Sequence, residues 1–163
     1  MDTNAIQQMN ELRLDSIMPS VKANNRKQLL QQLAKHTSKL IGTPEKTLFD
    51  NLIDMEAEQN SSIGHGVAIP HYRLPRLTKP IFIFAKLERP IDYNANDGNP
   101  VDLVCLVLSP EHEGPIHLRR LAKAARFFNN SQFRQDLRMA ETSNDVKKAL
   151  KEVNTVRKAK KAA

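Results

Sequence analysis

The sequence predicts an α/β sandwich in which helices cover a central β-sheet. Two segments rich in β-branched and apolar residues are typical of strands, at 80–88 (PIFIFAKLE) and 101–109 (VDLVCLVLS). Helical periodicity occurs both before and after these segments. The chain has 163 residues, of which 40% are hydrophobic, and this is enough apolar material for one core.

The first half of the chain predicts two helices in succession. The segment 24–42 (NNRKQLLQQLAKHTSKLIG) carries leucines at helical spacing, with Asn24 or Asn25 as the N-cap and Gly42 as the terminator. Thr43 followed by Pro44 is typical of a cap with proline at the first helical position. A second helix is therefore expected from there to about Gln59.

The strands and the remaining helices follow. Residues 67–69 (VAI) predict a short strand, and the strand at 101–109 is apolar at consecutive positions, as expected when both faces are covered. Cys105 lies inside that strand and should be an inert core thiol. Three more helices are expected, at about 117–128, 131–139 and 143–153.

The positive charge is concentrated at the end of the chain. Residues 147–163 hold seven lysines and arginines against Glu152 alone, which accounts for +6 of the net charge of +7. We therefore expect a single domain over 1–153 and a flexible, basic tail over 154–163. Aromatic residues make up only 5% and Trp is missing, so no specific nucleic-acid partner is expected.

Nothing in the sequence predicts export or membrane insertion. The first 15 residues contain no apolar segment of the kind found in signal peptides. The longest apolar run, residues 103–108, is far shorter than the roughly 20 residues that a membrane span needs. A cytoplasmic location follows as the expectation.

Several kinds of active site are excluded by their motifs. The segment 63–73 (IGHGVAIPHYR) begins like G-x-G-x-x-G but lacks the third glycine, and neither G-K-[ST] nor G-x-S-x-G occurs. Residues 112–117 (HEGPIH) resemble a zinc-binding H-E-x-x-H, but the histidines are five apart and Gly114-Pro115 should prevent a helix. We therefore expect no metal and no cofactor.

The segment 63–73 remains the candidate site because of His71. Pro70 restricts the backbone before it, and Gly64 and Gly66 leave room for a close partner or a phosphate. A neutral imidazole, with a usual pKa near 6.5, has an unshared electron pair that can attack phosphorus without a separate base. On these residues alone, a hydrogen-bonded loop histidine remains the simpler interpretation.

Three segments in order carry a specific resemblance, and together they span about residues 12–153. They resemble the IIA proteins of the fructose/mannitol type in the phosphotransferase system, most of all the stand-alone nitrogen-related (PtsN-like) members. The resemblance implies a mixed α/β sandwich, a phosphoryl group carried on His71 and a second histidine, His117, that orients or stabilises it. The segments are 63–71 (IGHGVAIPH), 87–110 (LERPIDYNANDGNPVDLVCLVLSP) and 117–128 (HLRRLAKAARFF).

The same resemblance implies a function. An HPr-like (NPr-type) carrier protein would phosphorylate His71, helped by the backbone amides around Gly64 and Gly66, and the two forms would regulate partners such as potassium-transport or sensor-kinase proteins. One alternative is a binding-only regulator with a slowed or vestigial site. Another is a IIA component of a sugar transport system, which is disfavoured because no IIB, IIC or carrier domain is visible in the 163 residues.

This chain departs from the family pattern at three positions. Met55 stands where the family usually has an arginine before a retained Glu56, His65 replaces a common asparagine between the glycines, and Tyr72 replaces a common glycine after the active histidine. A missing guanidinium would remove a contact of about 1.5–3 kcal/mol to a phosphoryl group. Arg73 is the candidate that could replace it.

Overall fold

The computed structural model describes residues 10–162 of the chain. Residues 1–9 and Ala163 lie outside the described part. The expectation that the chain begins without a signal peptide falls mainly on those first residues and therefore stays an expectation. In the described residues, no helix combines the length and the apolar character that crossing a membrane requires.

The described residues form one mixed β-sheet of six strands. The order across the sheet is β1-β5-β6-β3-β2, and β4 lies beside β6. β6 pairs in parallel with β3 and β4 and antiparallel with β5, while β1 is parallel to β5 and β2 is antiparallel to β3. The strands are β1 (Ser16–Val21), β2 (Ser62–Gly64), β3 (Val67–Ala68), β4 (His71–Leu74), β5 (Ile81–Ile91) and β6 (Val101–Pro110).

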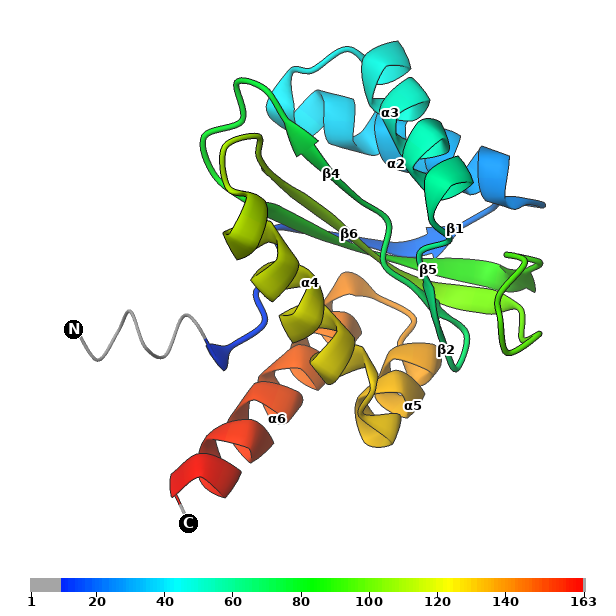
Figure 1. Ribbon diagram of the computed structural model, residues 1–163. Helices are drawn as coiled ribbons and strands as arrows, with labels where there is room; N and C mark the ends of the chain where they lie inside the picture. Colours follow the sequence, from blue (N-terminus) through cyan, green and yellow to red (C-terminus); the bar gives the residue numbers. More distant parts are fainter. Residues whose placement is uncertain (1–9, 163) are drawn as a thin grey trace.

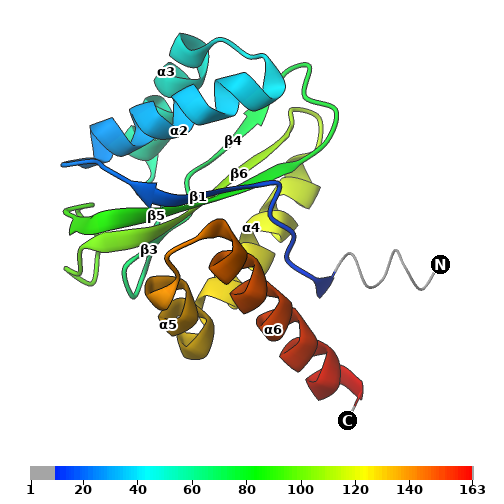
Figure 2. The same cartoon turned by 180° about the vertical axis from the view of Figure 1, so that it is seen from behind.

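Helices cover both faces of this sheet, so the predicted α/β sandwich is confirmed (Figures 1 and 2). On one face lie α2 (Arg26–Ile41) and α3 (Glu45–Glu58). On the other lie α4 (Gly114–Phe128), α5 (Ser131–Met139) and α6 (Ser143–Ala162). Each face has its own hydrophobic cluster, and the sheet separates the two.

The central strand β6 contributes to both clusters, which explains its continuous apolar sequence. Alternate side chains of a strand point to opposite faces, so both sets must be apolar here. Burial raises the pKa of the Cys105 thiol to about 12, in agreement with an inert core cysteine. The α2–α3 side receives Val104, Leu106 and Leu108, and the other side receives Leu103, Cys105 and Val107.

Most predicted helices are confirmed, with two corrections at their starts. Gly42 ends α2 with φ of 78°, a conformation that favours glycine. Pro44, and not Thr43, is the N-cap of α3. The expectation that Gly114-Pro115 prevents a helix is wrong, because α4 begins at Gly114. The backbone N–H groups in the first turn of a helix have no acceptor within the helix. Proline, which lacks this N–H, is therefore tolerated there.

Three strands were not predicted, and each gains its stability from a neighbour. β1 is an edge strand that contains Pro19, and its only sheet partner among the described residues is β5. β2 has three residues and pairs with β3. β4 carries the polar residues His71 and Arg73, so it shows no continuous apolar pattern, and its pairing with β6 defines it.

The expected flexible tail over 154–163 is corrected by the structure, because α6 continues as a helix to Ala162. Asn154 both accepts a hydrogen bond from the Leu12 backbone amide (3.1 Å) and donates one to the Leu12 carbonyl (3.0 Å). The Arg157 guanidinium lies 4.4 Å from the centre of the Phe127 ring. These side chains hold the helix against the fold beyond the predicted end at residue 153.

We predict that Asn154→Ala destabilises the protein by about 1–3 kcal/mol. The substitution leaves the amide and carbonyl of the buried Leu12 without their partners. Urea unfolding of the variant measures the change, and the exposed Asn144→Ala on the same helix is the matched control. Equal stability of the two variants would show that α6 does not anchor the N-terminal segment through Asn154.

Candidate functional site

β4 determines the position of His71. The strand runs parallel to β6, with His71 opposite Val107, and the Pro70 carbonyl accepts a hydrogen bond from the Val107 amide (2.9 Å). Alternation along β4 places His71 and Arg73 on one face and Tyr72 on the other, where it packs against the cluster under α2 and α3. The side chain of Tyr72, one of the three departures from the family pattern, therefore points away from the imidazole of His71.

The structure brings His71 and His117 together. Nδ1 of His71 lies 3.1 Å from Nε2 of His117, and the ring centres are 5.1 Å apart. His117 belongs to the first turns of α4 and is buried, whereas His71 is half-buried. Since Nδ1 of His71 is engaged, Nε2 is the nitrogen left for an incoming group.

A chain of buried and partly buried polar groups continues from His117 and supports this histidine pair. Nδ1 of His117 lies 2.7 Å from the Ser109 hydroxyl, which also accepts a hydrogen bond from Arg120 (3.0 Å). Arg120 in turn forms an ion pair with Glu113 (3.2 Å). The order of groups is therefore Glu113, Arg120, Ser109, His117 and His71.

Sequence reasoning missed Glu113, Ser109 and Arg120. One signal was available, because positions 113, 117 and 120 have the spacing of residues on one face of a helix. No comparable signal marks Ser109, which reads as the last residue of an apolar strand. Its role depends on where β6 ends relative to α4, and this is a tertiary feature.

The surroundings favour the neutral form of both imidazoles. Burial, together with the positive charges of His71, Arg73 and Arg120, lowers the pKa of His117 to about 4. Burial also lowers the pKa of His71, and the carboxylate of Glu56 acts in the opposite direction. Both rings therefore keep an unshared electron pair at neutral pH.

Arg73 lies at the same end of the sheet as the histidines. Its Nη1 donates a hydrogen bond to the Glu111 carbonyl (3.0 Å), and a Cβ added at Gly114 would lie 3.2 Å from that nitrogen. The guanidinium is therefore adjacent to the N-terminus of α4, which carries a partial positive charge. Arg73 itself is exposed, so this end of the site is open to an approaching anion.

The glycine segment, residues 63–66, lies elsewhere, and here the sequence expectation needs correction. β3 meets β6 at Leu103 and Val104, whereas His71 meets Val107. Four residues of strand correspond to about 13 Å, so the amides around Gly64 and Gly66 do not surround His71. The structure does not bring these two glycines together with the histidine pair.

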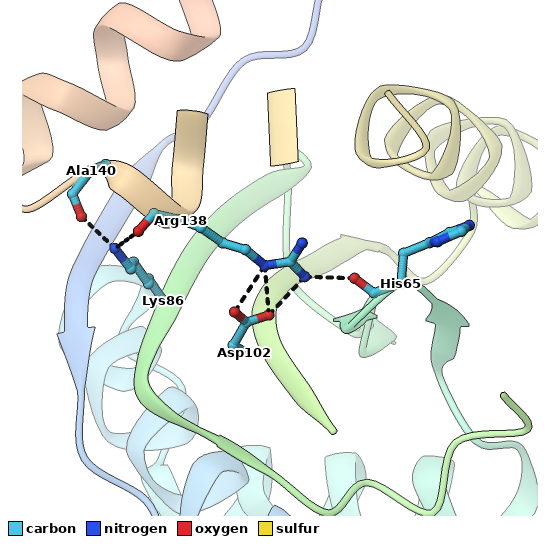
Figure 3. A network of polar contacts seen from close by, with 5 residues as sticks. All are labelled: His65, Lys86, Asp102, Arg138 and Ala140. Atoms are coloured by element: carbon cyan, nitrogen blue, oxygen red, sulfur yellow. Dashed lines mark hydrogen bonds and ion pairs between the residues drawn. The ribbon is translucent and has the colours of Figure 1, made fainter. Parts of the chain in front are cut away.

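Instead, the glycine segment is held by a network at the other end of β6 (Figure 3). Arg138 donates to the carbonyl of His65 (2.6 Å) and pairs with Asp102 (2.9 Å), while Asp97 accepts from the His65 amide (3.0 Å). Gly66 has φ of 77°, and a Cβ there would lie 2.6 Å from the Arg138 guanidinium. Gly66 therefore leaves room for Arg138 where it stands, in a backbone conformation that residues with a side chain rarely adopt.

The Met55 position lies on the opposite side of the sheet, on α3. Met55 is half-buried, and the next residue, Glu56, is buried and accepts hydrogen bonds from the Ser61 amide (3.0 Å) and the Tyr93 hydroxyl. Burial and the Glu56 carboxylate together raise the pKa of Tyr93 well above its usual value. The carboxylate of Glu56 also acts on His71, since it opposes the lowering of the pKa of His71 by burial.

In the part of the chain that the structure describes, no group of three or more His, Cys, Asp or Glu side chains is arranged to hold a metal ion. A pair of neutral imidazoles, one with a free Nε2, beside a guanidinium and a helix N-terminus, can accept a phosphoryl group.

Comparison with known proteins identifies the family and the fold of this chain. The chain is 41% identical to a nitrogen regulatory protein of Bradyrhizobium diazoefficiens over 132 residues, which is 81% of this chain and 86% of the relative. Its fold matches the crystal structure of nitrogen regulatory protein IIA-Ntr from Neisseria meningitidis with a TM-score of 0.77 and 23% identity, over 90% of this chain and 99% of that one.

The fold also matches enzyme IIA mannitol of Escherichia coli, in a structure of its complex with phosphorylated enzyme IIB mannitol. The TM-score is 0.69 at 15% identity, over 87% of this chain and 98% of that one. Residues 11–153 match the family model described as phosphoenolpyruvate-dependent sugar phosphotransferase system, EIIA 2. The chain therefore belongs to the EIIA 2 family of the phosphotransferase system, as a member similar to the nitrogen regulatory proteins.

Proposed function

We propose that His71 accepts a phosphoryl group on Nε2 from an HPr-like (NPr-type) carrier and that the protein regulates its partners according to its phosphorylation state. The observation that carries the proposal is the contact between Nδ1 of His71 and Nε2 of His117 (3.1 Å). This contact fixes the ring and leaves Nε2 as the nucleophile. The lowered pKa of each histidine supports a neutral ring at physiological pH.

The transfer step can be written with these groups alone. In the reactive tautomer, Nδ1 of His71 holds the proton and donates a hydrogen bond to Nε2 of His117, while the electron pair on Nε2 of His71 attacks phosphorus. The donor phosphohistidine carries a proton on its other ring nitrogen. Its N–P bond breaks, the electron pair returns to the donor ring, and the ring therefore leaves as neutral imidazole. The positive charge that develops on His71 is shared through the hydrogen bond to His117.

The charges around the histidines suit a phosphoryl dianion. The Arg73 guanidinium lies beside Gly114 at the N-terminus of α4, and the first turn of α4 contains no acidic residue. The nearby carboxylate of Glu113 is paired with Arg120. A phosphoryl group would therefore meet a guanidinium and a helix dipole without an unpaired carboxylate from α4.

The partners are proposed from the relatives. A phosphorylated protein is bound by the IIA mannitol relative, which supports docking of a phosphocarrier on this fold. The nitrogen regulatory relatives support a regulatory role. The targets proposed from the family resemblance are potassium-transport or sensor-kinase proteins in the cytoplasm. A second candidate is a binding-only regulator, favoured by the absence of a guanidinium at Met55.

We expect incubation with phosphoenolpyruvate and the general phosphotransferase proteins to add about 80 Da, one acid-labile phosphoryl group, to the wild type. His71→Ala should abolish the modification, because it removes the nucleophile. Intact-mass spectrometry measures this, and the exposed His65→Ala is the control that should still be modified. An unmodified wild type would favour the binding-only regulator, and label on His65 or His117 would refute the assignment to His71.

His117→Ala should slow phosphorylation of His71 by about 10- to 1000-fold without abolishing it, as expected for loss of one positioned hydrogen-bond partner. His117→Gln keeps a carbonyl oxygen that can accept from Nδ1 of His71 and should recover part of the rate. Rapid-quench measurement of the phosphorylation rate distinguishes the variants. Equal rates for wild type and His117→Ala would reduce His117 to a packing residue.

Met55→Arg should speed phosphorylation of His71 or slow hydrolysis of the phosphohistidine, because it supplies the guanidinium that the family resemblance implies at this position. Ala57→Arg adds the same charge at an exposed position of α3 and is the control. The transfer rate and the free energy of unfolding are measured on both variants. A loss of several kcal/mol without faster transfer would show that Met55 packs in the interior and does not face the phosphoryl group.

A further inference from the structure

Ser109 has an unusual position for a hydroxyl group. It is fully buried near the end of β6, and among the described residues its oxygen has two partners, Arg120 and Nδ1 of His117. Arg120 is held in place by the carboxylate of Glu113, to which Nη2 donates at 3.2 Å from both oxygens. A guanidinium can only donate, so one lone pair of the hydroxyl is always occupied.

The remaining hydrogen bond of Ser109 decides the tautomers of both histidines. If the hydroxyl donates to Nδ1 of His117, then His117 carries its proton on Nε2 and donates to Nδ1 of His71, whose own proton is on Nε2. If the hydroxyl instead accepts from Nδ1 of His117, then His117 carries its proton on Nδ1, and its Nε2 accepts a hydrogen bond from Nδ1 of His71. Only the second arrangement leaves the electron pair on Nε2 of His71.

Hydrogen-bond satisfaction favours the first arrangement. There the Ser109 hydroxyl donates to His117 and accepts from Arg120, so each of its groups is paired. In the second arrangement the hydroxyl accepts twice, and its own proton has no partner among the described residues. A buried, unpaired hydroxyl donor is unfavourable, and the positive Arg120 beside it also favours a lone pair on the adjacent Nδ1.

We propose that Ser109, held by Arg120, is a positioning residue that keeps the resting proton of His71 on Nε2 and so restrains phosphoryl acceptance. The inference rests on the proposed function, in which Nε2 of His71 is the nucleophile. In the resting state that follows, the ring of His71 is neutral and correctly placed, but its attacking nitrogen, Nε2, is protonated. Phosphoryl acceptance is therefore slow.

Activation then requires an exchange of protons without a change in their number. Nε2 of His71 gives its proton to water, and the proton on Nε2 of His117 moves to Nδ1 of His71. Nδ1 of His117 takes up a proton from water during a local opening of the site, because His117 and Ser109 are buried. The Ser109 hydroxyl changes from donor to acceptor. A docked carrier that offers its phosphoryl group to Nε2 would draw this equilibrium toward the reactive form.

The tautomers are tested directly by two-bond ¹⁵N–¹H NMR of the imidazoles in the full chain, without any phosphoryl donor. We expect Nε2 protonation of His71 and His117 in the wild type. Ser109→Ala should shift the ratio toward Nδ1 protonation by roughly 5- to 150-fold, the effect of one unpaired buried hydroxyl. The matched control is Ser16→Ala, because Ser16 also contacts a histidine, Nε2 of His36, at 2.7 Å. It should change only His36.

A wild type already protonated on Nδ1 of His71, or a Ser109→Ala variant with unchanged tautomers, would overturn the inference. The second readout is the phosphorylation rate, which Ser109→Ala should raise and Ser16→Ala should leave unchanged. A slower Ser109→Ala variant would also contradict a restraining role. Absence of phosphorylation in the wild type would refute the proposed function alone, because the tautomers are measured independently.

Discussion

The pairing of three strands with β6 is the constraint on which the rest of this structure depends. β6 is buried on both faces, so its alternate side chains build the two hydrophobic clusters and the helices must cover both sides. The same strand holds β3 near its start and β4 near its end. Because β4 is fixed in register, His71 lies at the end of β6 where Ser109 and the following helix α4 are found.

The histidine pair combines two features that are difficult to obtain together. A nucleophilic imidazole must stay neutral, and burial with nearby cations achieves this for His117 and burial for His71. The same cations must still attract a phosphoryl group. The structure separates these tasks in space, since Arg120 lies behind His117 and pairs with Glu113, whereas Arg73 is exposed beside the N-terminus of α4.

The opposite end of β6 has a structural task. Arg138, from the last turn of α5, connects Asp102 of β6 with the backbone of His65 (Figure 3). Gly66 leaves the space that the guanidinium occupies. This network ties the helical layer to the short strand β3, and β3 leads through Pro70 into β4. The glycine segment therefore contributes to the site by fixing the path of the chain toward His71, at a distance from the imidazole itself.

The sequence by itself determined the layers, the two long strands and the core cysteine, because periodicity and local turn chemistry are encoded in neighbouring residues. It also indicated that His117 belongs with His71, through resemblance to a family. Only the tertiary structure decided that Ser109 contacts His117, that the glycines lie away from the imidazoles and that α6 continues to Ala162. These features depend on strand register and on contacts between segments far apart in the chain, which no local pattern of residues encodes.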